Sequence, residues 1–431
     1  MLSTPGLEVR DRPHPPERVA VIGSGVAGLT AAYLLSRTMS VTLYEADDRL
    51  GGHAHTHDVA GPDGPMPVDT GFIVHNDRTY PVLRRLFTEL GVTWRPTEMS
   101  LSIRDDDTGL EYAGGRGLPG FVARPRQLAS PEYLRLLLEV RRFHQVGREF
   151  LERTDDEDVL TFGELLTSHG FSPSFIRRYA VPVVSCVWST GGAEALDYPA
   201  RYLLRFLSHH GMLSVGNSPT WATVRGGSRV YVEAIASRLD AVRMGHRVES
   251  VLRDPDLVSV SDNRGVTQHF DKVVIATHPD QALDLLDDAT PQEKEVLGAF
   301  RYTRSQALLH TDPSLLPRAR AARSSWNFLV RSDGTGAPLV TYWLNRLQGL
   351  PASHPLFVTL NGADLVSPQS VIAEMDYAHP AYDLEAVRAQ RLLPGLSTGR
   401  TAFAGAYHGW GFHEDGARSG VAAAAAFGVT W

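Results

Sequence analysis

Residues 17–52 read ERVAVIGSGVAGLTAAYLLSRTMSVTLYEADDRLGG and decide the fold of the chain. The apolar pattern over Arg18–Gly23 predicts a short buried strand, and the spacing over Leu29–Leu35 predicts a helix. The loop between them, Gly23-Ser24-Gly25-Val26-Ala27-Gly28, follows the pattern G-x-G-x-x-G. In that pattern the first glycine permits a tight turn, and the second lets the backbone approach a pyrophosphate. The third lets helix and strand pack closely.

A second strand and an acidic residue complete a nucleotide-binding unit. The segment Ser40–Tyr44 is predicted to be a strand that ends at Glu45, about 20 residues after the glycines, where a carboxylate binds a ribose hydroxyl. The N-terminus of the intervening helix offers unpaired N–H groups and a positive dipole end to phosphates. The stretch therefore predicts a bound dinucleotide and leaves NAD and FAD open.

Composition limits the classes of protein to which the chain can belong. The 431 residues are enough for two domains, and 43% hydrophobic and 21% charged residues are typical of a globular protein. A net charge of −7 argues against a nucleic-acid partner. The single cysteine, Cys186, excludes an internal disulfide and fits a reducing, cytoplasmic setting. Segment 1–16 has no apolar core and is expected to be a disordered leader, and no window is apolar enough for a transmembrane helix.

Two short motifs after the nucleotide unit separate FAD from NAD. Arg49-Leu50-Gly51-Gly52 and Asp69-Thr70-Gly71 resemble motifs of the flavin amine oxidase, protoporphyrinogen oxidase and phytoene desaturase superfamily. In that superfamily the R-x-G-G segment passes close to the cofactor pyrophosphate. The resemblance implies FAD, with contacts from Glu45, Ala46, Arg49, Gly51, Gly52, His53, Thr70, Gly71 and Phe72.

The far end of the chain resembles the closing motif of the same superfamily. Residues 402–426 read AFAGAYHGWGFHEDGARSGVAAAAA. Gly416, Ala417 and Gly420 are small where a backbone must approach a ring, and Glu414 or Asp415 would cap the helix. The positive end of that helix would face the flavin's pyrimidine edge. The implied cofactor contacts here are Gly405, Ala406, Phe412, Glu414, Asp415, Gly416 and Ser419.

Segments from the middle of the chain extend the resemblance. Arg225-Gly226-Gly227-Ser228 and the following helix precede a strand at 246–251, in which the Val248 backbone would meet the adenine. Residues 270–277 then return the chain beneath the cofactor, which adds Ala276 and Thr277 to the implied contacts.

The fold class expected from these segments is α/β. A discontinuous Rossmann-like FAD-binding domain of the GR2 type would comprise 17–78, 222–290 and 395–431, and an inserted α+β substrate domain 79–221 and 291–394. Helical spacing over 131–150 and 161–169 makes residues 79–221 largely helical. Strand-like runs at 305–311, 325–330, 339–344 and 356–360 predict a sheet.

The reaction is inferred from a narrower resemblance. GGHAHTHDV, VDTGFIVHN, VVSCVWSTGGAEALDYPAR, SSWNFLVR, TYWLNRLQGL and GFHEDGARSG look like a bacterial branch known as FAD-dependent amine oxidoreductases. Its members are commonly encoded beside cyclopropane-fatty-acid-synthase-like methyltransferases. The branch implies an FAD-dependent oxidoreductase that desaturates a small, lipid-like acyl chain, with a double-bond isomerase and an amine oxidase as alternatives. Relatives that act as lipid-binding escorts offer a non-catalytic alternative, which would require degenerate flavin motifs.

The use of lysine lowers the rank of amine oxidation. Flavin amine oxidases typically carry a lysine near flavin N5, and the corresponding run at 300–306 has none. Lys272 and Lys294 are the only lysines of the chain, and neither is expected to serve. An aromatic cage for an amine could still be built from Tyr407, Trp410 or Phe412.

Desaturation needs a group that accepts the second proton. The candidates near the expected flavin segments are His413, Tyr407 and His408, with His413 first because it precedes the helix that faces the ring. A histidine that only bonds backbone or flavin oxygen is the alternative.

Several other features have an ordinary structural interpretation. His53, His55 and His57 alternate, but no metal is expected because strand-mates alone supply no carboxylate or thiol. Cys186 is expected to be a small buried hydrophobe. Segments 118–126 and 133–143 mix apolar residues with arginines, which indicates a solvated helix face or a peripheral membrane contact. Five aromatic residues are expected in the core or along a tunnel: Trp188, Trp221, Trp326, Tyr342 and Trp343.

Overall fold

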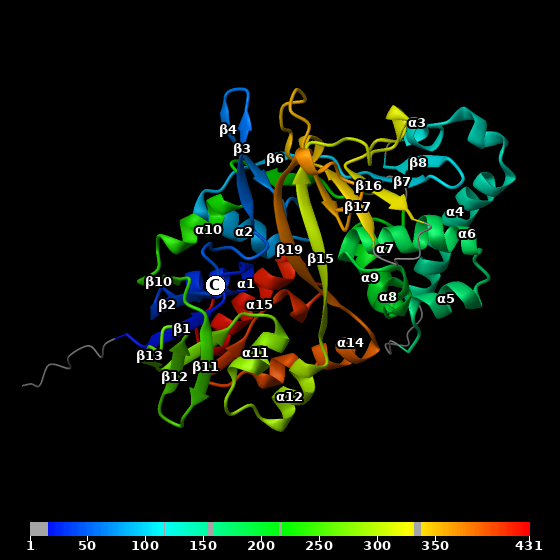
Figure 1. The fold of residues 1–431 in the computed structure, drawn as a ribbon. Helices are drawn as coiled ribbons and strands as arrows, with labels where there is room; N and C mark the ends of the chain where they lie inside the picture. Colours follow the sequence, from blue (N-terminus) through cyan, green and yellow to red (C-terminus); the bar gives the residue numbers. More distant parts are fainter. Residues whose placement is uncertain (1–15, 116, 153–158, 215–217, 332–337) are drawn as a thin grey trace, which may run out of the picture.

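A five-stranded parallel sheet forms the lower left of the molecule in Figure 1. The computed structural model describes residues 16–115, 117–152, 159–214, 218–331 and 338–431, so that nearly all of the predicted leader, 1–16, lies outside the described residues. The sheet order is β10-β2-β1-β14-β20. The bounds are β10 Ala241–Met244, β2 Ser40–Glu45, β1 Arg18–Ile22, β14 Lys272–Ile275 and β20 Thr401–Phe403.

Strands far apart in the sequence pair in this sheet. Val19 pairs with Val41 on one side and with Lys272 on the other, and Ile275 pairs with Phe403. Because the central strands are buried on both faces, their sequences are continuously apolar rather than alternating. The parallel sheet with its first strand–helix–strand unit confirms the predicted α/β class.

Helices α1 (Val26–Leu35) and α15 (His413–Ala426) pack closely against each other beside this sheet. A Cβ atom on Gly420 would lie 2.4 Å from the Ala27 carbonyl oxygen, and one on Gly416 would lie 2.6 Å from Val26 Cγ1. The small residues of α15 are therefore required by the approach of α1, whereas the sequence pattern had indicated an approach to a ring.

A seven-stranded sheet forms the second layer, in the order β19-β15-β18-β17-β16-β7-β8. All its pairs are antiparallel except β16–β7. The bounds are β19 Val371–Ala381, β15 Arg301–His310, β18 Phe357–Leu360, β17 Leu339–Trp343, β16 Trp326–Val330, β7 Leu101–Asp105 and β8 Leu110–Gly114. The four strand runs predicted from the sequence are confirmed, and β19, β7 and β8 are additional strands.

Helices cover the far end of this sheet, at the right of Figure 1. Both predicted helices are present, as α4 and α5. The segment 94–114, expected within a largely helical region, instead forms strands. The helices and helical turns of this part are α3 Gly117–Phe121, η1 Pro125–Ala129, α4 Pro131–Glu152, α5 Phe162–Ser168, α6 Pro173–Phe175, η2 Ile176–Ala180, α7 Val181–Trp188, α8 Gly192–Asp197 and α9 Ala200–His209.

The remaining elements connect the two large sheets. Two small sheets and one hairpin are β11-β12-β13, β5-β9-β6 and β3-β4. Their strands are β3 Thr56–Gly61, β4 Gly64–Asp69, β5 His75–Asn76, β6 Trp94–Pro96, β9 Trp221–Val224, β11 Val248–Arg253, β12 Val258–Asp262 and β13 Thr267–Phe270. The other helices and turns are α2 Pro81–Leu90, α10 Arg229–Ala236, α11 Pro279–Leu285, α12 Pro291–Gly298, η3 Arg320–Ala322, α13 Leu344–Gln348, η4 Pro368–Ser370, α14 Leu384–Gln390, η5 Leu393–Leu396 and η6 Ala406–His408.

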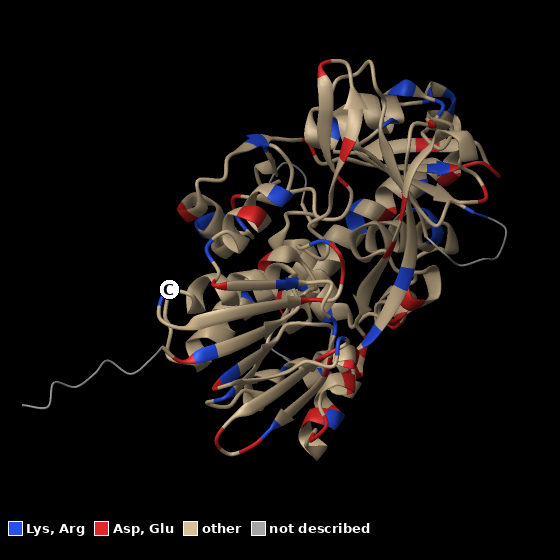
Figure 2. Ribbon diagram, turned by 60° about the vertical axis from the view of Figure 1, so that its left-hand side comes forward, with Lys and Arg blue, Asp and Glu red and all other residues tan. Residues whose placement is uncertain are grey.

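Charge follows the expected distribution for a globular chain. Figure 2 shows Lys, Arg, Asp and Glu mixed over the outer helices and loops, while the interior strands are largely free of them. Among the described residues, no helix combines the length and the apolar character that crossing a membrane requires.

We propose that the chain divides into the two domains predicted from the sequence. The strands of the parallel sheet all fall within 17–78, 222–290 and 395–431, and those of the seven-stranded sheet within 79–221 and 291–394.

Candidate functional site

One large cavity, of about 2090 Å³, lies between the parallel sheet and the seven-stranded sheet. It is about twice the upper end of an ordinary small-molecule pocket, about 300–1,000 Å³. Its walls come from both sheets and from the α4 and α7 helices, so an occupant can contact segments that are hundreds of residues apart in the chain.

The first turn of α1 forms the nucleotide end of the cavity. Gly23 has a positive φ of 100°, and a Cβ there would lie 2.7 Å from the Ala276 carbonyl oxygen. A Cβ on Gly25 would meet nothing within 4 Å, so the backbone at Gly25 faces open space. The helix has no side-chain cap and no acidic residue in its first turn. The free backbone N–H groups at this helix N-terminus, next to the open space at Gly25, can bind an anion such as a pyrophosphate.

Glu45 lies at the carboxyl end of β2, beside this turn. Its Oε2 accepts hydrogen bonds from the N–H and the hydroxyl of Ser24, at 2.9 and 2.5 Å, and its Oε1 accepts one from the Asp47 N–H at 3.0 Å. Glu45 and Val248 both line the cavity. The carboxylate is thus held rigidly, with lone pairs left for a ribose hydroxyl.

The R-x-G-G segment folds back over the glycine loop. Arg49 Nη1 donates to the Gly52 carbonyl oxygen at 2.8 Å, and the Gly51 N–H donates to Ser24 Oγ at 3.0 Å. Gly51 and Gly52 both have positive φ, which favours glycine at each. A Cβ on Gly52 would lie 3.3 Å from Gly25 Cα, so the two loops are in contact.

Asp69, the first residue of the D-T-G motif, has a structural role. It is buried and accepts hydrogen bonds from Thr56 Oγ1 at 2.6 Å and from the Ser228 N–H at 2.9 Å. It thereby joins the β3–β4 hairpin to the start of α10. Thr70, Gly71 and Phe72, which follow it, line the cavity.

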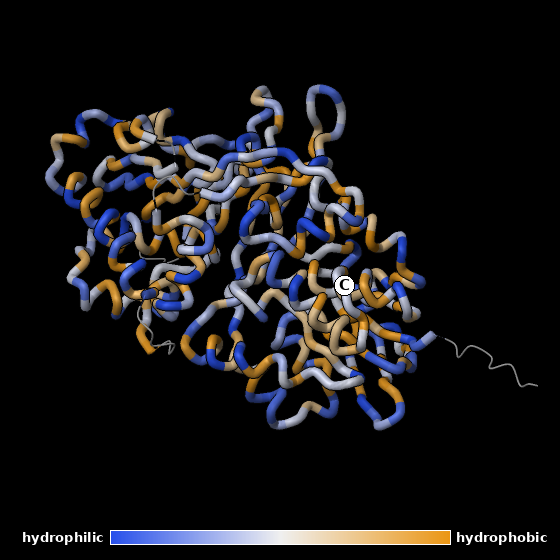
Figure 3. Tube along the Cα trace, turned by 180° about the vertical axis from the view of Figure 1, so that it is seen from behind, coloured by the Kyte–Doolittle hydropathy of each residue, from blue (hydrophilic) through white to orange (hydrophobic). Residues whose placement is uncertain are grey.

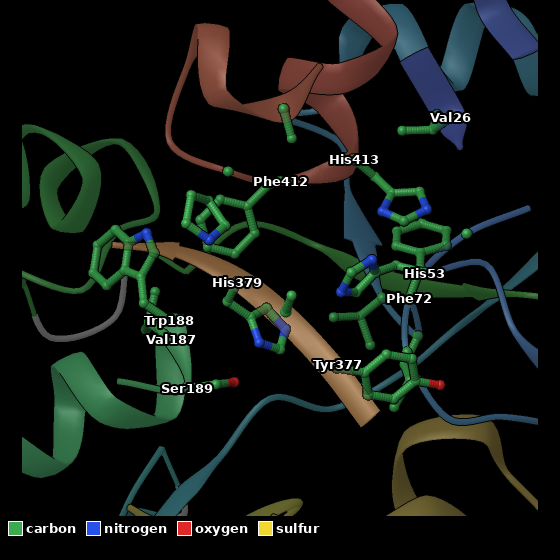
Figure 4. A pocket seen from close by; sticks show the side chains of 18 of the residues that line it. Val26, His53, Phe72, Val187, Trp188, Ser189, Tyr377, His379, Phe412 and His413 are labelled. Atoms are coloured by element: carbon green, nitrogen blue, oxygen red, sulfur yellow. The ribbon is translucent and has the colours of Figure 1, made fainter. Parts of the chain in front are cut away.

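Histidine and aromatic rings converge on the middle of the cavity (Figure 4). His413 stacks on Phe72 with 3.8 Å between ring centroids. His53 stacks on Tyr377 at 5.1 Å and meets His379 edge-on at 5.2 Å. The Nε2 atoms of His53 and His413 are buried and have no hydrogen-bond partner within the protein. Since buried polar atoms are normally satisfied, these rings indicate a polar occupant.

Burial keeps these imidazoles neutral. It lowers the pKa of His413 to about 3, and burial together with the nearby His278 lowers the pKa of His379 to about 4. For His53, burial and the neighbouring histidines lower the pKa well below its usual range. Each ring is therefore uncharged at neutral pH and can accept a hydrogen bond at its unprotonated nitrogen.

The three alternating histidines do not share one strand face. The β3 strand begins only at Thr56, so His53 turns into the cavity while His55 and His57 pack against each other at 4.1 Å. Within the described ranges, no group of three or more metal-ligating side chains is placed to hold a metal ion.

The C-terminal segment contributes both to the wall of the cavity and to its support. Tyr407, Phe412 and His413 line the cavity, whereas His408 does not. The Asp415 carboxylate accepts the Phe412 N–H at 3.1 Å, as a residue that caps its own helix does. Glu414 instead accepts the N–H groups of Val82 and Leu83, each at 3.0 Å, and so caps α2.

The cavity brings together most of the residues expected to hold FAD. Those that line it are Gly23, Ser24, Gly25, Val26, Ala27, Glu45, Ala46, Arg49, Gly52, His53, Thr70, Gly71, Phe72, Val248, Ala276, Thr277, Gly405, Ala406 and Phe412. Those that lie behind the lining are Gly28, Gly51, Glu414, Asp415, Gly416 and Ser419.

A group of uncharged residues from α3, α4 and α7 and from nearby strands and turns forms part of the cavity lining, and we call this part the apolar section. It consists of Tyr112, Phe121, Leu137, Val140, His144, Tyr179, Val183, Cys186, Val187, Trp326 and Tyr342. The same cavity also has charged lining residues, among them Asp280, Asp284 and Asp376. Burial raises the pKa of the Cys186 thiol, so this cysteine acts as a small hydrophobe. Of the five aromatic residues expected in the core or along a tunnel, Trp188, Trp221, Trp326 and Tyr342 line the cavity.

Sequence reasoning missed Tyr377 and His379. Both lie on β19, two residues apart, so they point to the same side of the strand. A period-two pattern around residue 377 was the available signal. Neither lysine lines the cavity: Lys272 pairs with Glu17 at 2.7 Å, and Lys294 lies on α12.

Known proteins match the chain over most of its length. A family model described as flavin containing amine oxidoreductase matches residues 26–315. Polyamine oxidase 3 from Oryza sativa subsp. japonica is 25% identical over 284 residues, which are 64% of this chain and 54% of that protein. The chain spans 54% to 65% of the length of the curated relatives that it matches over most of its own length.

Solved structures share the fold. Cyclohexylamine oxidase from Brevibacterium oxydans IH-35A superposes with a TM-score of 0.68 at 17% identity, covering 96% of this chain and 99% of that one. A CLA-producing fatty acid isomerase from P. acnes superposes with a TM-score of 0.67 at 17% identity, covering 94% of this chain and 97% of that one. With the family match over more than half of its residues, the chain belongs to the flavin containing amine oxidoreductase family, and FAD is its cofactor.

Proposed function

We propose that the chain is an FAD-dependent oxidoreductase that desaturates an apolar, lipid-like acyl chain. The observation that carries this proposal is the apolar section, the part of the cavity lining around α3, α4 and α7 that contains no charged side chain. A hydrocarbon chain gains free energy by leaving water for such a surface. An ammonium group would lose its hydration there without an ionic partner.

The cofactor would be held by the cavity-lining residues named above, with the α1 N-terminus at the pyrophosphate and Glu45 at a ribose hydroxyl. When bound, FAD supplies a two-electron acceptor for a hydride. The protein's part is to hold the acyl C–H bond beside that acceptor, to exclude water and to take up the second proton.

His413 is the proposed proton acceptor. Its ring is fixed against Phe72 at 3.8 Å, lines the cavity and keeps one buried nitrogen without a partner. Tyr407 lines the same wall, while His408 lies behind it. Bound FAD would supply the acceptor for one hydrogen as hydride, and His413 would take up the neighbouring hydrogen as a proton, so that the substrate would be left with a carbon–carbon double bond.

A pair of variants tests this role. His413→Gln should keep bound FAD but slow anaerobic flavin reduction by at least about 100-fold, the lower range for general base catalysis. His408→Gln is the matched control, because a histidine outside the lining should leave the rate within about twofold of wild type. If flavin reduction in both variants stayed within about twofold of the wild-type rate, His413 would take no proton.

The proposed reaction is tested by anaerobic mixing of the flavoprotein with candidate substrates. Saturated and monounsaturated fatty acids and their phospholipids should bleach the visible flavin absorbance, and the product should be lighter by two hydrogen atoms. Bleaching by mono-, di- or polyamines with release of ammonia would instead support an amine oxidase, as the names of the curated relatives suggest.

A double-bond isomerase is the second candidate. The apolar section suits the same class of substrate, and the P. acnes structure of the same fold is described as a fatty acid isomerase. A product of unchanged mass with a shifted double bond would select it over desaturation.

A further inference from the structure

The outer surface of α3, η1 and the first half of α4 exposes an unusual group of leucines. Leu118 is 78% exposed and Leu138 68% exposed, the two highest values for a large apolar side chain among the described residues. Leu128 is 43% exposed and Leu134 is 45% exposed. Leu134 and Leu138 are four residues apart on α4 and so lie on one face of the helix.

Arginines surround these leucines. The segment 117–148 contains six arginines and two glutamates, which gives a local charge of +4 in a chain of net charge −7. One of the glutamates, Glu139, is buried and bonded to Ser172, and the other, Glu132, pairs with Arg178. Figure 3 shows apolar and polar residues interleaved along this corner of the molecule, at its upper left.

Two of the arginines are available to an anionic partner. Arg126 on η1 and Arg141 on α4 are exposed, and within the described residues no carboxylate pairs with either. Exposed leucines beside cations match the chemistry of an anionic lipid surface, which offers both an apolar layer and negative headgroups.

The same elements also form the wall of the apolar section. Gly117 and Phe121 of α3 and Leu137 and Val140 of α4 line the cavity, directly beside Leu118 and Leu138 in the sequence. Gly117 lines the cavity and is itself exposed, so the cavity lining and the exposed leucines meet at this corner. The hydrogen bond from Tyr133 Oη to the Phe121 carbonyl oxygen, at 2.6 Å, ties α3 to α4 there.

We propose that this α3–α4 surface, formed by Leu118, Leu128, Leu134, Leu138, Arg126 and Arg141, docks on an anionic phospholipid bilayer. The leucines enter the interface and the arginines contact lipid phosphates. The proposal places the cavity lining at Gly117 against the acyl layer, so that a chain enters the apolar section from the bilayer without crossing water. The docking is inferred from the exposed leucines and arginines alone. The passage of a substrate, in contrast, rests on the proposed desaturase function.

Flotation with phospholipid vesicles tests the docking with the full-length flavoprotein. The wild type should float with phosphatidylcholine vesicles that contain phosphatidylglycerol, and binding should fall as salt rises. Leu118→Glu/Leu138→Glu and Arg126→Glu/Arg141→Glu should each weaken partitioning by at least about tenfold, since each variant loses two anchoring groups. Leu252→Glu, at a 42% exposed leucine on β11, is the matched control and should float like the wild type.

Other outcomes would overturn the docking. They are wild-type protein that stays unbound, paired variants that float equally well, or sedimentation showing that the leucines bury each other in a dimer. Bound FAD and the melting temperature check that every variant is folded. Flavin reduction by substrate dispersed in detergent needs no vesicle, so a failed proposed function is recognised separately from a failed docking.

Discussion

Gly25 is the N-cap residue of α1 and Gly28 lies in the first turn of the helix, and the protein needs each of them for a different reason. A Cβ on Gly28 would lie 1.9 Å from the Gly23 carbonyl oxygen, which the fold itself forbids. A Cβ on Gly25 would meet no protein atom within 4 Å, and the residue's φ of −63° suits alanine.

Alanine at the two positions should therefore have opposite effects. Gly25→Ala should leave the melting temperature of the FAD-free protein nearly unchanged but weaken FAD binding by at least about tenfold, because the methyl group occupies the path of the pyrophosphate. Gly28→Ala should destabilise the FAD-free protein by about 1–3 kcal/mol or more through overpacking. Calorimetric melting and FAD titration measure both effects, and normal FAD affinity in Gly25→Ala would contradict the placement of the pyrophosphate.

The same contrast explains which site residues the sequence could predict. The glycine loop and Glu45 lie in one local strand–helix–strand unit, so spacing alone identifies them. Tyr377 and His379 reach His53 only because β19 pairs with β15 at the edge of the second sheet, with His379 opposite Thr303. No local pattern encodes that register.

At the scale of elements, the sequence predicted those with a clear apolar period and missed three strands of the second sheet, β7, β8 and β19. The apolar periodicity of α4, α5 and β15–β18 was sufficient to predict these elements. The β7–β8 pair, in a region predicted to be largely helical, contains Asp105 and Glu111, both buried, and these charges interrupt the apolar pattern by which a strand is recognised. Asp105 accepts from Arg178 Nε at 2.7 Å, and Glu111 accepts the Arg318 N–H at 3.0 Å, so the partners that allow this burial come from distant segments.

The contact between α15 and α2 makes stability depend on pH. Burial raises the pKa of Glu414 from its ordinary 4.5 to about 7. Below about pH 4.5 the carboxyl is protonated in both the folded and the unfolded state. Between pH 4.5 and 7 only the folded state retains the proton, so the free energy of unfolding falls as pH rises through this window. The fall attributable to Glu414 should approach about 3 kcal/mol.

Glu414→Gln removes that titration and retains one acceptor oxygen for α2. The free energy of unfolding of both proteins is measured by chemical denaturation between pH 4.5 and 8. As pH rises, the wild type should lose stability relative to the variant. The charge of Asp415 also contributes to the raised pKa of Glu414, so the comparison reports how Glu414 titrates beside Asp415. Glu385→Gln, at an exposed position in the first turn of α14, should follow the wild type. A pH-independent difference for Glu414→Gln would exclude the raised pKa.

At the scale of the whole molecule, the cavity lies between the two large sheets and takes lining residues from both, so bound FAD would contact both. The nucleotide end touches α1, and the ring-lined centre reaches His379 on β19. FAD should therefore slow hydrogen exchange in both elements and raise the stability of the protein by about 2.7 kcal/mol at 100 times its dissociation constant. ADP, which carries only the nucleotide half, should protect α1 but leave β19 exchanging as in the FAD-free protein. Equal exchange of β19 with and without FAD would contradict a cofactor that spans the two sheets.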